Sequence, residues 1–341
     1  MTEQMRIAAR HFVAVRRIPP ASGVAFRAGI SVLVPLLAVV ALGHLDWSPY
    51  AAFGAFTAIY GRNHVHLSRA AMQASAGAAF TASVIAGVLV GSGSSRAWVA
   101  VGAAAVVAAV GAALAKAQDW HPPGPMFLVF AFGAVASAPH VLADVPVAAG
   151  VTAASALFAL VVGSLAGLVW GEPSRPSRPR SVWTWNSVRC AVAVLLAGGT
   201  ATAVGIGHPY WAMVAAVAPL SAPGITHQVV RAGHRIVGTL GGLLTAAVVL
   251  TLGLAPVPMV LAIAVLQVAT EWLIGRNYAL ALLFITPMAL LMGQIAAPRP
   301  VGSLLFDRAV ETVIGAVIGL LIILAGVLLH RRAEGRIGAQ A

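Results

Sequence analysis

The chain has 341 residues, of which 60% are apolar and only 9% are charged. Soluble globular domains carry about a quarter of their residues as Asp, Glu, Lys or Arg, so this composition excludes an ordinary soluble protein. The single cysteine, Cys190, excludes a disulfide framework.

Twelve apolar segments are long enough to form helices. They predict an all-α polytopic membrane protein with about twelve transmembrane helices. The first six segments cover residues 24–43, 49–60, 70–91, 97–115, 124–138 and 147–170. The second six cover residues 187–206, 209–223, 236–254, 257–274, 278–293 and 309–329.

The segments divide the chain into two six-helix units joined by a run rich in Pro, Ser and Arg, which cannot span a membrane. We expect a basic cytoplasmic segment, a first repeat, a cytoplasmic linker, a second repeat and a basic cytoplasmic tail, which are residues 1–23, 24–170, 171–186, 187–329 and 330–341.

The distribution of Lys and Arg predicts the orientation of the chain. If the N-terminus is cytoplasmic and each segment crosses once, sixteen basic residues lie inside and only Arg96, Arg299 and Arg308 lie outside. Arg27 and Arg189 lie at the cytoplasmic ends of their segments. Both termini are therefore predicted to be cytoplasmic, and the net charge of +12 reflects topology and does not indicate nucleic-acid binding.

An internal duplication is the most informative feature of the sequence. Arg27 and Arg189 are 162 residues apart, and Ser48-Pro-Tyr50 precedes the similar His208-Pro-Tyr210 by 160 residues. Units of six spans share one orientation, so the two repeats are expected to be parallel, with a site at or near their interface.

The second and eighth segments are short, occupy equivalent positions in the two units and contain prolines. Interrupted segments at matching positions indicate a binding site in transporters, because the freed backbone groups must line a cavity or be buried in protein. Two ordinary short helices inside the bundle are an equally good interpretation.

Three motifs in the second half resemble the fusaric acid resistance and aromatic acid exporter family. They are His208-Pro-Tyr-Trp-Ala212, Arg231-x3-Arg235-x2-Gly238-Thr239-x2-Gly242 and Arg308-x2-Glu311-Thr312-x2-Gly315. The first half is degenerate: Gln73 stands in the place of Arg235, and Ala156 and Ala159 stand in the places of Arg308 and Glu311. Larger members carry a sizeable soluble region, which the short linker does not supply.

The resemblance implies efflux of aromatic carboxylates across a bacterial cytoplasmic membrane. Arg231 and Arg235 share one helix face, and a guanidinium binds a carboxylate through two hydrogen bonds; anchoring at the cytoplasmic surface is the alternative, above all for Arg231. The predicted substrate-binding residues are His208, Tyr210, Trp211, Arg231, Arg235 and Thr239.

Asp307, Arg308 and Glu311 open the last segment and are the predicted proton-coupling residues. Charged groups that enter hydrocarbon normally pair, so an ion pair of Arg308 with Glu311 or Asp307 is the structural alternative. His208 also suits a proton-linked exporter, because imidazole titrates near neutral pH.

We expect no metal and no cofactor, because His64 and His66 have no nearby cysteines or carboxylates and no Walker A sequence is present. No combination of nucleophile, base and orienting group indicates an enzyme. The leading hypothesis is a proton-linked exporter of organic anions. An anion channel and a non-transporting membrane partner are alternatives. The expected partners are a small organic anion and the lipid bilayer, and a homo-oligomer is compatible with the sequence.

Overall fold

The computed structural model describes residues 9–15, 22–61, 66–169 and 184–338. Every regular element within these ranges is helical, which confirms the predicted all-α membrane protein. The helices of the first half are α2 (Ser22–Ala41), α3 (Ser48–Ala55), α4 (His66–Gly91), α5 (Arg96–Ala117), α6 (Met126–Ala136) and α7 (Asp144–Val169), with 3₁₀ turns η1 (Leu45–Trp47) and η2 (Phe56–Ile59). Those of the second half are α8 (Trp185–Val204), α9 (Tyr210–Leu220), α10 (Ile225–Thr251), α11 (Pro256–Ile274), α12 (Tyr278–Ala296) and α13 (Val301–Gly338).

Nine helices in the described ranges are long and apolar enough to cross a membrane, and α3, α6 and α9 are shorter. α6 and α9 have 11 residues each. At 1.5 Å per residue this is about 16 Å, roughly half of the hydrocarbon core of a bilayer. All twelve predicted segments are thus helical, but the predicted number of twelve membrane spans is not confirmed.

Two predicted boundaries were wrong for the same physical reason. α10 begins at Ile225 and α13 begins at Val301, whereas the sequence placed these starts at residues 236 and 309. The predicted segments were ended at charged residues. In the fold, however, Arg235 and Arg308 lie within the helices and are only 3% and 1% exposed.

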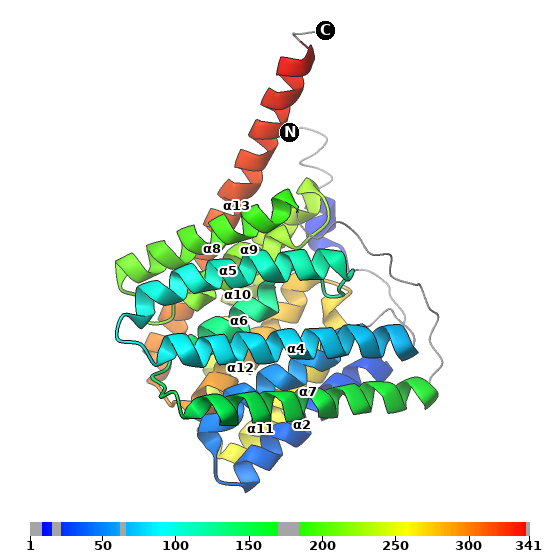
Figure 1. The fold of residues 1–341 in the computed structure, drawn as a ribbon, viewed down its shortest axis with the longest axis vertical. Coiled ribbons are helices and arrows are strands. Elements are labelled where there is room, and N and C mark those ends of the chain that lie inside the picture. Colours follow the sequence, from blue (N-terminus) through cyan, green and yellow to red (C-terminus); the bar gives the residue numbers. More distant parts are fainter. Residues whose placement is uncertain (1–8, 16–21, 62–65, 170–183, 339–341) are drawn as a thin grey trace.

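Helices from the two halves pack against each other on two sides of the bundle. α5 packs on α8, and α2 packs on α11. Figure 1 shows α4, α5, α7 and α8 with nearly parallel axes, whereas the C-terminal part of α13 projects beyond the other helices. The short helices lie between these outer helices, with α3 packed on α7 and α9 packed on α13.

Glycines of α13 allow the short helix α9 to approach closely. Ten of the eleven residues of α9 are buried. A methyl group added at Gly315 would overlap the carbonyl oxygen of Ala212, and one at Gly319 would crowd the carbonyl oxygen of Ala216. The spacing of two small residues by four positions therefore serves backbone-to-backbone packing, as it does in other membrane helices.

We predict that Gly315→Ala lowers the free energy of unfolding by about 1–3 kcal/mol, because the added methyl group forces α9 and α13 apart. Gly302→Ala in the same helix is the matched control, since nothing lies within 4 Å of its added methyl group. Thermal unfolding of the purified protein in detergent measures both variants. Equal melting temperatures would show that the contact at Gly315 does not limit stability.

Candidate functional site

A hollow of about 230 Å³ lies between the two halves of the chain, and we call it the large hollow. Short helices α6 and α9 contribute to its wall together with η2 and α10 to α13. Its lining residues are Phe56, Ile59, His121, Pro122, Met126, Phe127, Phe130, Trp211, Val214, Arg231, Arg235, Gln267, Thr270, Glu271, Ile274, Tyr278, Ile285, Met288, Ala289 and Arg308.

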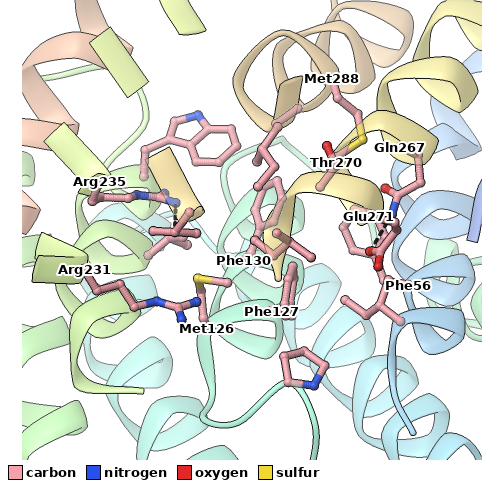
Figure 2. Close-up of a pocket in the computed structure, with 18 of the residues that line it drawn as sticks. Phe56, Met126, Phe127, Phe130, Arg231, Arg235, Gln267, Thr270, Glu271 and Met288 are labelled. Atoms are coloured by element: carbon pink, nitrogen blue, oxygen red, sulfur yellow. Dashed lines mark hydrogen bonds between the residues drawn. The ribbon is translucent and has the colours of Figure 1, made fainter. Parts of the chain in front are cut away.

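One wall of the large hollow is cationic. Arg231 and Arg235 lie one turn apart on α10, and Figure 2 shows both side chains on the same side of the hollow. Tyr278 of α12 contacts both. Arg235 donates a hydrogen bond of 3.0 Å to its hydroxyl oxygen, and the guanidinium carbon of Arg231 lies 4.3 Å from its ring centroid. Tyr278 therefore positions the two arginines, a role that no sequence motif indicated.

Arg308 of α13 completes the cationic wall. Its three guanidinium nitrogens are buried and have no hydrogen-bond partner among the residues that the structure describes. The guanidinium carbon instead lies 3.6 Å from the ring centroid of Trp211. Within the described part of the chain, Arg308 forms no salt bridge with Asp307 or Glu311, so the ion pair considered from sequence is not formed.

The opposite wall is polar, and the floor between the walls is apolar. Gln267 and Glu271 lie one turn apart on α11, and the Gln267 amide donates a 3.2 Å hydrogen bond to the Glu271 carboxylate. Figure 2 shows this pair across from the arginines, with aromatic and methionine side chains between. Such a hollow suits a molecule with an apolar body and a negative charge at one end. The side chains between the two walls include Met126, Phe127, Phe130 and Met288.

A second, small hollow of about 130 Å³ lies toward the other end of the short helices. His208, Tyr210 and Arg299 contribute its polar lining, and Pro49 and Phe53 bring α3 into its wall. The small hollow shares Phe130, Trp211 and Ala289 with the large one.

Glu311 is fully buried and lines neither hollow. Its Oε1 accepts a 2.8 Å hydrogen bond from the backbone N–H of His208, while its Oε2 has no hydrogen-bond partner. Glu311 therefore joins α13 to the start of α9. Asp307 lies nearby, with a carboxylate oxygen 4.0 Å from Nδ1 of His208.

His208 lies in the loop between α8 and α9. Burial, with a smaller effect of Arg299 and Arg308, lowers the pKa of His208 to about 4. Burial therefore favours the neutral form of this side chain, whereas the sequence-based expectation started from the pKa of a solvent-exposed imidazole.

The structure brings together Arg231, Arg235, Trp211 and Arg308 at the large hollow. It places Thr239 elsewhere, fully buried and outside the lining of both hollows. The neighbouring Gly238 and Gly242 pack on α12, because added methyl groups there would crowd the backbone of Ala279 and Leu282. This stretch of α10 thus serves helix packing.

Comparison with known proteins agrees with the sequence motifs. Residues 191–322 match a family model described as fusaric acid resistance protein-like. The chain is also 32% identical over 162 residues to the uncharacterized membrane protein YvaC of Bacillus subtilis (strain 168). That alignment covers 44% of this chain and only 26% of YvaC. No solved structure matches the chain.

The matched region runs from α8 into α13 and includes both arginines of α10 that line the large hollow. Residues 191–322 are therefore similar to the fusaric acid resistance protein-like family, which confirms the resemblance predicted from the motifs in this part of the chain.

Proposed function

We propose that this protein transports organic anions, with aromatic carboxylates as the substrate class, and that the large hollow is the binding site. The observation that carries the proposal is the pair of buried guanidinium groups, Arg235 and Arg308, in a hollow with aromatic lining. Nε of Arg235 and all three nitrogens of Arg308 are buried without a hydrogen-bond partner.

Burial of these charged groups requires a partner that compensates for their loss of water. A charged side chain at the centre of a membrane helix costs about 2.5–3.5 kcal/mol, unless a partner offsets the loss of water. A carboxylate offers two acceptor oxygens in the geometry that the guanidinium group requires. An aromatic body attached to that carboxylate would contact Phe127, Phe130 and Met288, which line the apolar part of the hollow.

We also propose that the two halves are parallel six-helix repeats. The pairing of helices supports this: α3 packs on α7 as α9 packs on α13, and α4 packs on α6 as α10 packs on α12. The contact of α5 with α8 has its counterpart in the contact of α11 with α2. Such a relation puts the large hollow at the interface between repeats, where substrates bind in transporters of this design.

Within this proposal, the protein lies in the bacterial cytoplasmic membrane with both termini in the cytoplasm and exports its substrate. Glu311 is the proposed proton carrier, because it is the buried carboxylate on the helix that also supplies Arg308. An anion channel is the second candidate. The observation in its favour is that the two hollows adjoin each other and share three lining residues.

The first test concerns the anion site. We predict that Arg235→Gln and Arg308→Gln each weaken benzoate binding by about tenfold or more, because hydrogen bonds to charged groups contribute about 1.5–3 kcal/mol. Arg235→Lys should also weaken binding, since an ammonium group keeps the charge but not the planar fork. Isothermal titration of the purified protein measures the affinities.

Arg276→Gln is the control for this test. Arg276 lies next to the start of α12 but lines neither hollow. Its variant should bind benzoate like the unmodified protein. Unchanged affinity in folded Arg235→Gln and Arg308→Gln would refute the anion site.

The second test separates an exporter from a channel. Glu311→Gln should retain benzoate binding but lose export driven by a pH gradient, because the amide cannot release a proton. Transport into inverted vesicles, with and without an imposed gradient, measures this. In a channel the flux has no proton dependence before or after the substitution. Gradient-driven export that persists in Glu311→Gln would leave this residue only its structural bond to the His208 backbone.

The third test concerns orientation. In a Cys190→Ala background, Ser94→Cys in the α4–α5 connection should react with a membrane-impermeant thiol reagent added to intact cells, and Gly275→Cys in the α11–α12 connection should not. The reason is that the basic residues place the α11–α12 connection in the cytoplasm. The opposite labelling pattern would invert the proposed topology.

A further inference from the structure

The two hollows adjoin each other. Phe130, Trp211 and Ala289 line the large hollow and the small hollow alike. These residues therefore lie where the two hollows meet. Phe130 comes from the first half of the chain and the other two come from the second half.

Phe130 is the centre of an aromatic cluster at this meeting point. Its ring centroid lies 4.6 Å from that of Trp211 and 5.0 Å from that of Phe53. Tyr210 stacks on it at 6.1 Å. These spacings are those of favourable aromatic pairs, which contribute about 0.5–1.5 kcal/mol beyond the burial of their surface.

All four aromatic residues are carried by helices that are too short to cross a membrane. Phe53 belongs to α3, Phe130 to α6, and Tyr210 and Trp211 to α9. The large hollow is lined by the N-terminal part of α6 and the small hollow by its C-terminal part, and the start of α9 contributes to both.

Arg308 connects this cluster to the anion site. Its guanidinium group lies against the Trp211 ring, and this contact takes the place of the hydrogen bonds that the group lacks. A buried cation–π contact of this kind contributes about 2 kcal/mol. The arginine that faces the large hollow thus also holds the indole in position. Arg235 instead donates a hydrogen bond to the hydroxyl oxygen of Tyr278.

We propose that Phe130 and Trp211 form the barrier that divides the transport path, and that Arg308 is the positioning residue that keeps Trp211 in this barrier. The assignment of a path rests on the proposed function. The barrier itself rests only on the two hollows and the rings between them.

The experiment measures access across the barrier, in a Cys190→Ala background that carries Thr270→Cys in the large hollow. A small, membrane-impermeant methanethiosulfonate is added on the side where Ser94→Cys reacts. This is the side of the small hollow, because the end of α4 and the end of α6 meet there through the hydrogen bond from His140 N–H to the Gly91 carbonyl. The rate of labelling at position 270 is the readout.

Phe130→Ala should raise the labelling rate by about tenfold or more, because removal of a large buried side chain leaves a cavity that the surroundings fill only in part. Phe127→Ala is the matched control, since Phe127 lines the large hollow alone. Its labelling rate should stay close to that of the parent. Equal rates in the two variants, with both proteins folded, would overturn the barrier.

The role of Arg308 has its own control. Arg308→Gln should raise the labelling rate, and Arg308→Lys should raise it less, because an ammonium group retains part of the cation–π attraction. Arg276→Gln, outside both hollows, should leave the rate unchanged. A rate in Arg308→Gln equal to that in Arg276→Gln would remove Arg308 from the barrier. Labelling requires no substrate, so failure of benzoate binding and failure of the barrier are distinguishable.

Discussion

The arrangement of the site depends on one constraint, which is the burial of the Arg308 guanidinium without hydrogen bonds. A buried cation in a poorly polar environment needs compensation, and the face of an aromatic ring supplies part of it. Trp211 must therefore lie against Arg308. The Arg308 guanidinium group also lines the large hollow, where an anion would complete its hydrogen bonds. The chemistry of the hollow follows from this incomplete compensation.

The short helices supply the space for that chemistry. An α-helix that crosses the bilayer satisfies its own backbone and leaves little room beside it. The N-terminal part of α6 lines the large hollow, its C-terminal part lines the small hollow, and the start of α9 contributes to both. This geometry requires α9 to be held close to α13, which Gly315 and Gly319 permit. Gly315 and Gly319 therefore affect the site indirectly, because they set the position of α9, which carries Trp211.

The first half shows how the corresponding positions serve structure. Gln73, which stands in the place of Arg235 in the proposed repeat, donates its amide hydrogen bond to the Tyr60 carbonyl. Arg69, in the place of Arg231, donates to the Gly163 carbonyl. Backbone carbonyls of the first half thus accept the hydrogen bonds of these side chains. In the second half the corresponding side chains line the hollow, which makes the site asymmetric.

Composition and hydrophobic periodicity determined the membrane class, the helical character and the approximate position of the helices from α2 to α13, because apolar length is a local property. The motifs also predicted Arg231, Arg235 and Trp211 as candidate site residues. The two arginines stand out because charge inside an apolar run is visible in the sequence. Only the tertiary structure decided that Arg308 faces Trp211 and not Glu311, that Tyr278 holds two arginines, and that Phe130 lies where two hollows meet. These relations join residues far apart in the chain, and their partners are set by how the short helices pack.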